Sequence, residues 1–291
     1  MKYRINHVTR YRYQALVPIG HTRVCLAPRR CANQEPVRTQ LEVVPSPAYL
    51  SQRVEDYYGN EVRYFSVQSP HVALEITSHS EVEILPAPLP DMAASLPWEQ
   101  ARDTLRRAET PALLDAYQFT FASGSVELSP ELGEYTAGSF TPGRPILSAA
   151  VDLMGRIHRD FQYDPQATNV STPILEVFQN RRGVCQDFAH LQIGCLRTLG
   201  LAARYVSGYI APKRSATGIA FVGSQASHAW LSVYSPGQGW VDLDPTNDVV
   251  PSTDHITLAW GRDYDEVAPV RGVILGGGYQ DLEVSVSVVA V

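Results

Sequence analysis

The 291-residue sequence contains few cysteines and lacks long apolar runs. Its 4 cysteines form no C-x-x-C pair, and Cys185, His190 and Cys195 do not have a recognisable zinc spacing. We therefore expect neither a metal site nor a cofactor. No apolar run approaches the roughly 20 residues that a membrane-spanning helix needs, and residues 1–13 alternate like a strand without a signal-peptide core. We expect a cytoplasmic protein without a membrane partner.

An excess of positive charge is also missing. The chain has 24 lysines and arginines against 30 aspartates and glutamates, for a net charge of −6. This balance argues against nucleic acid as the main partner. Hydrophobic residues at 44% and charged residues at 19% are typical of a globular protein, and the length is sufficient for two domains, each with its own core.

The first third of the sequence has the pattern of an all-β domain. Short runs of β-branched and aromatic residues with alternating polarity predict strands over residues 2–13, 21–26, 39–44, 61–68, 72–77 and 79–85. The stretch Leu85-Pro86-Ala87-Pro88-Leu89-Pro90 is stiff and cannot continue a strand ladder. We place the domain boundary there, with an amino-terminal β-rich domain over 1–88 and a second domain over 89–291.

The second domain is predicted to be α+β. Helical spacing of apolar residues covers 98–108, 111–119 and 145–161, and Thr172-Pro173 begins a short helix over 174–180. Residues 123–143 are rich in Gly, Ser and Thr, which predicts an extended surface segment. Strands are expected over 202–210, 254–260 and 281–291. The polar loop 211–226 is long enough to be functional, and we expect it to shape a substrate groove.

The central motif of the second domain is a cysteine at a predicted helix start. Gly183 gives the backbone freedom for a tight turn, and after it apolar residues recur at spacings of three and four until Gly200. Cys185 then lies where free backbone N–H groups and the helix dipole favour an anionic sulfur. The position suits a nucleophile.

The helix start alone cannot activate a thiol. Lowering a cysteine pKa from about 8.5 to about 4–5 requires on the order of 5 kcal/mol, whereas a helix terminus supplies about 0.3–1 and at best about 2 kcal/mol. The usual source of the remainder is an imidazolium held by a carboxylate. His190 lies some 140° around the helix from Cys185, so it is an unlikely base.

A downstream hairpin supplies the histidine and the carboxylate. Residues 227–234 read as a strand, 235–239 as a turn and 240–246 as the returning strand. This folding brings His228 and Asp244 within a few residues of direct opposition, where facing side chains can hydrogen-bond. The register does not follow from the sequence, so placement of both side chains on one face is an assumption.

Several blocks together resemble the bacterial transglutaminase-like family of the papain-like cysteine enzyme superfamily. They are Gly183-Val184-Cys185-Gln186-Asp187-Phe188-Ala189-His190-Leu191, Leu199-Gly200-Leu201-Ala202-Ala203-Arg204-Tyr205-Val206-Ser207-Gly208-Tyr209, Ser227-His228-Ala229-Trp230 and Gly239-Trp240-Val241-Asp242-Leu243-Asp244-Pro245-Thr246-Asn247. The resemblance implies a triad of Cys185, His228 and Asp244. It also implies a papain/transglutaminase-like core, in which the helix carrying the cysteine packs on an antiparallel sheet, preceded by an all-β domain.

The resemblance implies acyl transfer on a peptide or protein substrate through a thioester. The Cys185 backbone N–H is the natural first oxyanion donor. Gln186 and Asn169 are weak candidates for a second donor. Trp230 could wall the cleft, and Asp263 and Tyr264, in a further block that resembles the family, are carried as substrate-binding candidates.

The identity of the acyl acceptor stays open in the sequence. The loops expected near the site are mostly polar, which favours water and hence hydrolysis of a peptide, isopeptide or side-chain amide. The alternatives are a protein-glutamine gamma-glutamyltransferase and a catalytically silent peptide-binding scaffold. The chain has no acidic loop with calcium-ligand spacing, so we expect any activity to be independent of calcium. The oligomeric state does not follow from the sequence.

Overall fold

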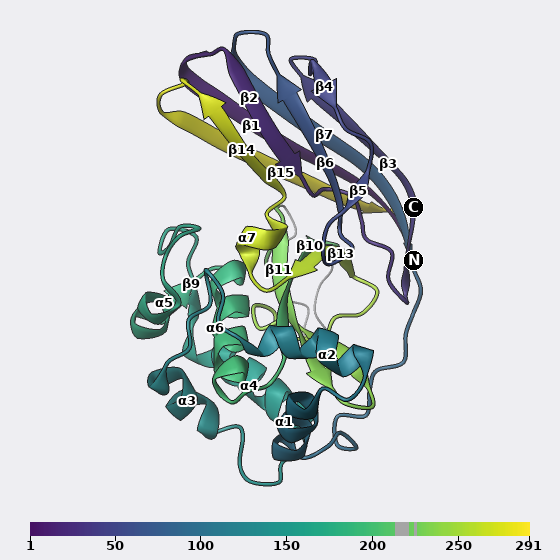
Figure 1. Ribbon diagram of the computed structural model, residues 1–291, viewed down its shortest axis with the longest axis vertical. Helices are drawn as coiled ribbons and strands as arrows, with labels where there is room; N and C mark the ends of the chain where they lie inside the picture. Colours follow the sequence, from purple (N-terminus) through teal and green to yellow (C-terminus); the bar gives the residue numbers. More distant parts are fainter. Residues whose placement is uncertain (213–220, 224–225) are drawn as a thin grey trace.

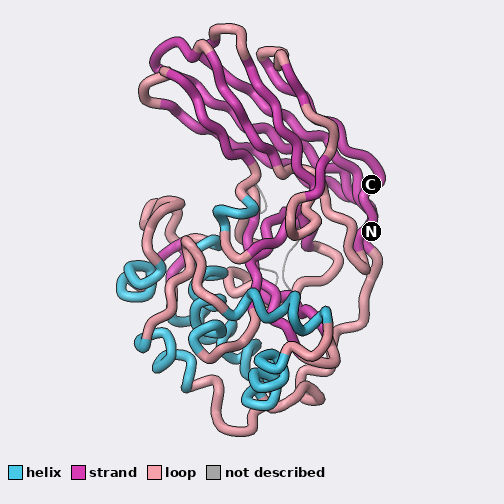
Figure 2. The backbone as a smooth tube through the Cα atoms, viewed as in Figure 1, coloured by secondary structure: helices cyan, strands magenta, loops and turns pink. Residues whose placement is uncertain are grey.

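The computed structural model describes residues 1–212, 221–223 and 226–291. Strands fill the upper part of Figure 1, and helices surround a smaller sheet in the lower part. Figure 2 shows the same division, with most magenta strands in one part and the cyan helices in the other. The chain is α+β, as predicted.

The β-rich part consists of two sheets packed face to face. One sheet has the strand order β15-β1-β7-β3, and the other has the order β14-β2-β6-β4 with β5 paired to β6. Apolar residues from both sheets, including Tyr13, Val17, Phe65 and Ile76, form one buried cluster between them. The strand bounds are β1 Lys2–Val17, β2 Ile19–Val24, β3 Gln34–Val44, β4 Tyr49–Leu50, β5 Val54–Glu55, β6 Glu61–Val67, β7 His71–Ile84, β14 Val270–Leu275 and β15 Gln280–Ala290.

The prediction of two strands over 72–77 and 79–85 needs correction, because β7 is continuous from His71 to Ile84. Ser78 lies in the ladder, facing Leu41 of β3 and His7 of β1. A polar residue within an alternating run therefore did not interrupt the strand.

The end of the chain returns to the β-rich part. β15 pairs with β1 from Tyr3 opposite Ala290 to Tyr13 opposite Gln280, and β14 pairs with β2. Both termini consequently lie side by side (Figure 1). The predicted division at residues 88/89 assigned these last two strands to the second domain, but the hydrogen-bonded ladders place them in the sheets of the first.

The remaining elements belong to the lower part of Figure 1. Their bounds are α1 Trp98–Arg107, α2 Pro111–Tyr117, η1 Gln118–Thr120, α3 Pro130–Ala137, α4 Ile146–Asp160, β8 Gln162–Tyr163, α5 Ile174–Asn180, β9 Arg182–Gly183, α6 Cys185–Thr198, β10 Ala203–Ile210, β11 His228–Ser235, β12 Gly239–Leu243, β13 His255–Gly261 and α7 Tyr264–Val267. None of the helices in the described part is long and apolar enough to cross a membrane.

Helix α3 corrects the prediction that residues 123–143 are an extended segment. Ser129 caps its first turn by accepting from the Leu132 N–H, and Pro130 occupies the first helical position. Leu132 and Thr136, four residues apart, are buried on one face. The Ser-Pro start and this spacing are a helix signal that the surrounding Gly, Ser and Thr residues concealed.

Helix α6 is the centre of the lower part. Every residue from Asp187 to Arg197 is buried, so the helix is enclosed on all sides rather than along the single apolar face that its spacing predicted. It packs on the sheet β12-β11-β10-β13, whose strands β10 and β11 are buried throughout. A separate apolar cluster joins β10 and β13 to β1, β7 and β15. This cluster attaches the β-rich part to the core.

Candidate active site

The start of α6 is fixed by a local hydrogen-bond pattern. Asp187 Oδ2 accepts from the Val184 backbone N–H at 2.8 Å and from Thr168 Oγ1 at 2.6 Å. A Cβ on Gly183 would lie only 2.7 Å from that same oxygen. Gly183 is therefore required for the close approach of Asp187, and Cys185 follows as the first helical residue with its position determined by the cap.

Two tyrosines lie close enough to Cys185 to interact with it electrostatically. Burial is the main cause that raises the pKa of Tyr163 to about 12, and the charge of Cys185 is the second. The same two causes, in the same order, raise the pKa of the buried Tyr205 well above its usual value. Both phenols stay protonated at neutral pH. Neither tyrosine was a candidate from the sequence, because the strands that carry them, β8 and β10, lie in different sheets.

His228 and Asp244 make a direct contact. His228 is the first residue of β11, and Asp244 directly follows β12. His228 Nε2 lies 2.8 Å from Asp244 Oδ2, with both side chains completely buried. Because a ring nitrogen next to a carboxylate oxygen must carry a proton to be attracted to it, Nε2 is the protonated nitrogen of the ring. Nδ1 is left as the free base whenever the ring is neutral.

Charges at this contact shift both pKa values toward the ion pair. Burial would lower the pKa of His228, but the charge and hydrogen bond of Asp244, followed by those of Cys185, raise it to about 10. Burial would raise the pKa of Asp244, but His228 and then His255 hold it well below its usual range. Cys185 thus lies near enough to act on His228, although no group in the described residues makes a regular hydrogen bond to His228 Nδ1.

Asp244 is held by more groups than His228 alone. At Oδ2, Asn247 Nδ2 approaches to 2.8 Å and His255 Nε2 to 3.0 Å. At Oδ1, the backbone N–H groups of Thr246 and Asn247 donate at 3.0 and 3.3 Å. Sequence reasoning selected neither Asn247 nor His255, although Asn247 follows the aspartate by only three residues.

Residues 221–223, which belong to the loop before β11, cover His228. Asn247 Oδ1 accepts from the Val222 N–H at 2.9 Å, which fixes residues 221–223 above the site. A Cβ on Gly223 would lie 2.6 Å from His228 Nδ1, and the φ of Gly223 is +93°. Only glycine fits here. The rest of the loop predicted to shape a groove, residues 213–220 and 224–225, lies outside the described residues.

The two side-chain amides predicted as oxyanion donors, those of Gln186 and Asn169, both make hydrogen bonds to residues 169–172. Gln186 Nε2 donates to the Val170 carbonyl at 3.2 Å. Asn169 Oδ1 accepts from the backbone N–H and the hydroxyl of Ser171. Both contacts stabilise residues 169–172 beside the first turn of α6, and an oxyanion role for either amide stays a prediction.

Trp230 is placed differently from its prediction as a residue that walls the cleft. The side chain is 0% exposed, and its Nε1 donates to Asp242 Oδ2 at 3.1 Å. Its ring lies against those of His228 and His255, with centroids 6.0 and 5.2 Å away. Trp230 therefore supports the histidines from inside and offers no surface to a substrate.

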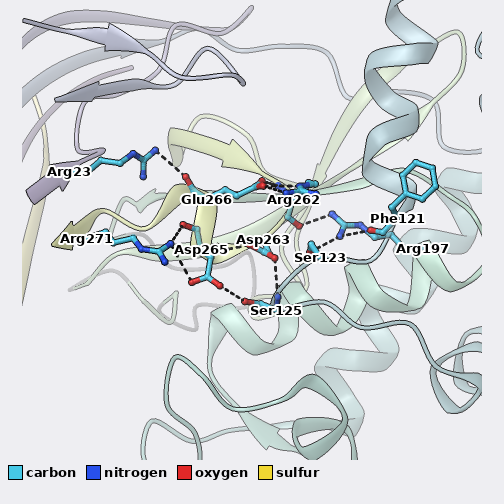
Figure 3. Close-up of polar contacts among 10 residues, drawn as sticks. All are labelled: Arg23, Phe121, Ser123, Ser125, Arg197, Arg262, Asp263, Asp265, Glu266 and Arg271. Atoms are coloured by element: carbon cyan, nitrogen blue, oxygen red, sulfur yellow. Dashed lines mark hydrogen bonds and ion pairs between the residues drawn. The ribbon is translucent and has the colours of Figure 1, made fainter. Parts of the chain in front are cut away.

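Asp263 belongs to a polar network between α6 and α7 (Figure 3), and Tyr264 follows it as the first residue of α7. Asp263 is buried, caps α7 and accepts from the Ser125 N–H at 3.0 Å. Tyr264 donates its backbone N–H to His190 Nε2 at 3.1 Å, and its ring packs in the same apolar cluster as Cys185. Both residues thus have structural contacts, and a role toward substrate stays a prediction.

The network in Figure 3 also ties α6 to its surroundings. Arg197 is 1% exposed and donates to the carbonyls of Phe121 and Arg262 at 3.1 and 2.7 Å. Arg23, on β2, donates to the Glu266 carbonyl at 3.1 Å. The β-rich part and α6 are therefore both anchored to the segment that begins with β13 and ends with α7.

His190 is buried, as its position on α6 predicted for a packed histidine. Burial lowers its pKa to about 4, and its Nε2 accepts from Tyr264. It stays neutral at physiological pH and is already hydrogen-bonded, which makes it unsuitable as the base for Cys185.

One group of possible metal ligands exists among the described residues. His228, Asp244 and His255 have ligand atoms within 4.8 Å of one another. Their separations of 2.8 and 3.0 Å are those of hydrogen bonds, and all three are buried. Hydrogen bonding therefore accounts for the arrangement.

A cavity of about 350 Å³ opens next to the first turn of α6. Its wall includes Val170, whose carbonyl accepts from Gln186, and Tyr264, which packs against the same apolar cluster as Cys185. The remaining wall is mainly hydroxyl and carboxylate groups, among them Ser125, Glu127 and Asp265. The wall of this cavity beside α6 is mostly polar.

Comparisons with known proteins identify the family of this chain. Residues 134–245 match the description of the transglutaminase-like superfamily, and residues 3–83 match the bacterial transglutaminase-like N-terminal region. A protein of Mycobacterium tuberculosis without an assigned function is 42% identical over 293 residues, covering 99% of this chain and 92% of the relative. A similar relative in Mycobacterium leprae is 33% identical, covering 98% and 97%.

Two further comparisons concern proteins with descriptions of activity. The structure of a candidate cysteine protease from Cytophaga hutchinsonii has a TM-score of 0.77 at 20% identity, covering 100% of this chain and 91% of that one. It shows the shared fold. A protein-glutamine gamma-glutamyltransferase of Pseudomonas aeruginosa is 34% identical over 97 residues, which are 32% of this chain and 14% of that enzyme.

Proposed function

The chain belongs to the bacterial transglutaminase-like proteins, and on this premise we propose that it is a cysteine enzyme that hydrolyses a peptide, isopeptide or side-chain amide. The observation that carries the proposal is the buried contact between His228 Nε2 and Asp244, made next to a cysteine at a helix start. It leaves His228 Nδ1 as the nitrogen available to the thiol.

In the first half of the reaction, His228 Nδ1 takes the proton of Cys185, and the sulfur attacks the amide carbon. A carbon–sulfur bond forms as the carbonyl oxygen becomes an oxyanion. The carbon–nitrogen bond then breaks, and the imidazolium returns the proton to the leaving amine. Asp244 stays ionised and stabilises the imidazolium throughout, consistent with its lowered pKa.

In the second half, water attacks the thioester. His228 Nδ1 takes a proton from the water, the carbon–sulfur bond breaks, and the carboxylic acid leaves as the thiol is regenerated. Oxyanion stabilisation is supported by the Cys185 backbone N–H at the start of α6.

The polar cavity beside α6 favours water over an amine as the acceptor. A transferase must keep water from the thioester until an amine arrives, which requires a closed and largely apolar approach. The cavity beside α6 instead has a polar wall that includes Ser125, Glu127 and Asp265, which supports water as the acceptor. The sequence also favoured hydrolysis because the loop before His228 is mostly polar. Residues 213–220 and 224–225 of that loop lie outside the described residues.

The test is to incubate the protein with a library of glutamine- and glutamate-containing peptides, with and without a labelled primary amine, and to follow products by mass. We expect hydrolysed products in both reactions, and none with Cys185→Ala. Amine incorporation that exceeds hydrolysis at millimolar amine would replace the hydrolase by a transferase. Binding of peptides without turnover would identify a scaffold.

A further inference from the structure

His255 is a second histidine on the proposed triad carboxylate. It is the first residue of β13, 11 residues after Asp244, and its Nε2 lies 3.0 Å from Asp244 Oδ2. Its side chain is 3% exposed, and that of Asp244 is 0% exposed. A hydrogen bond to a charged group in such a buried setting is strong and costly to lose.

The contact assigns one tautomer to His255. With hydrogen on Nδ1, the lone pair of Nε2 would face the lone pairs of the carboxylate at 3.0 Å, which is repulsive. Hydrogen therefore lies on Nε2. The ring is then oriented by its edge-on contact with Trp230, whose centroid is 5.2 Å away, while no described group hydrogen-bonds to its Nδ1.

The donors around Asp244 are divided between its two oxygens. His228, Asn247 and His255 meet at Oδ2, and two backbone N–H groups meet at Oδ1. The carboxylate cannot rotate without breaking several of these bonds. Since the backbone donors come from the turn that follows Asp244, they hold one edge of the carboxylate, and His255 holds the opposite edge from another strand.

We propose that His255 is a positioning residue that holds Asp244 in the orientation that keeps hydrogen on His228 Nε2. The proposal rests on the proposed function, because it concerns the same triad. His255 does not touch the thiol or the substrate. It acts through Asp244: without His255, Oδ2 would lose one of its three donors. The carboxylate would then hold the His228 Nε2–H less firmly and would favour less strongly the tautomer whose Nδ1 accepts the thiol proton.

The test compares two substitutions at this position. His255→Phe keeps a flat ring against Trp230 but removes the donor, whereas His255→Gln places an amide N–H near the former Nε2. We expect alkylation of Cys185 by iodoacetamide at about pH 6 to slow about 10- to 100-fold in the phenylalanine variant, the usual factor for one hydrogen bond to a charged group. In the glutamine variant it should recover to within a few-fold of the wild type.

A matched control separates positioning from stability. His7 is also a buried histidine, 1% exposed, with hydrogen bonds to Tyr209 and Thr9 in the packing between the β-rich part and the core. His7→Phe should lower the unfolding temperature without slowing alkylation. A second readout is the ring nitrogen spectrum of ¹⁵N-histidine-labelled protein, in which the signal of the His228 Nε2–H, held in the hydrogen bond to Asp244, should shift only in His255→Phe.

The outcomes distinguish this inference from the proposed function. If wild-type Cys185 reacts like an ordinary thiol, the proposed function fails, while the His228 spectrum still tests the role of His255. If the wild type is reactive and His255→Phe matches it in rate and spectrum, the positioning role is wrong. Failure of the glutamine variant to recover would equally overturn it, since the donor would then not be what matters.

Discussion

The two ends of the proposed triad are built differently. At the acid end, Asp244 is completely buried, with donors on both oxygens from three side chains and two backbone N–H groups. At the thiol end, Cys185 is only half-buried, and no regular hydrogen bond from a described residue reaches His228 Nδ1. The acid end is preorganised, whereas the thiol itself stays partly exposed.

This difference suits a nucleophile. A carboxylate that only orients an imidazole works best when it cannot move, but a sulfur that must form and break a bond to carbon needs space on one side. The cap of α6 fixes where Cys185 begins the helix without enclosing its sulfur. The comparison predicts that changes at the two ends have effects of different size and kind.

The largest effects should come from removing the triad groups themselves. Cys185→Ala should abolish turnover, and His228→Ala should lower it by about 10⁵-fold or more, because no other base in the described residues is placed to serve the thiol. Asp244→Asn should cost about 10⁴-fold or less, since an amide can still orient the ring. Turnover of the peptide substrate would be measured. Full activity in Cys185→Ser would contradict a thiol mechanism.

A smaller effect is expected from the cap below the thiol end. In Gly183→Ala the new Cβ would lie 2.7 Å from Asp187 Oδ2, so the cap must shift. We expect a loss of about 1–3 kcal/mol in the free energy of unfolding and slower alkylation of Cys185. Gly124→Ala is the control, because its Cβ would meet nothing closer than 3.6 Å. Equal urea midpoints in both variants would contradict the close-approach argument.

The acid end should also give stability a pH dependence. The pKa of His228 is raised to about 10 in the folded protein, so its contribution to stability is complete below about pH 6.5 and disappears as pH rises through about 10. Between pH 7 and 10 the wild type should lose roughly 3 kcal/mol more than His228→Gln. Urea unfolding at several pH values measures this. Parallel curves for the two proteins would speak against a buried imidazolium.

The smallest effect is expected from chelators. The close group of His228, Asp244 and His255 is connected by hydrogen bonds rather than arranged around an open site. EDTA should therefore leave turnover unchanged, and added calcium should not raise it. An activity that EDTA removes and calcium restores would show that a bound ion takes part in the reaction, contrary to this account of the two ends of the triad.

The sequence was informative where the structure is local. The helix from Cys185 follows from apolar spacing, and the hairpin that brings His228 to Asp244 follows from two strands and a glycine turn. Helix α3 was missed because its start signal lies in a Gly-, Ser- and Thr-rich segment. In each correct case the signal and the contact lie within a few tens of residues.

The features that the sequence did not predict depend on pairing between strands far apart in the chain. β13 pairs with β10 rather than with the hairpin, which is why His255 reaches Asp244, and no spacing in the sequence predicts this. The alternation in residues 281–291 predicts a strand but not its partner, which is β1 at the other end of the chain. Which residues meet across such ladders is decided by the packing of whole sheets, so local patterns could not supply it.

The most direct test of the central claim is the rate at which iodoacetamide labels Cys185 at about pH 6. If His228 and Asp244 hold an ion pair with the thiol, labelling should be rapid and stoichiometric, should be lost in His228→Ala, and should be unaffected in Cys195→Ala, whose thiol is completely buried. Slow labelling with the pH profile of an ordinary thiol, unchanged by His228→Ala, would contradict it.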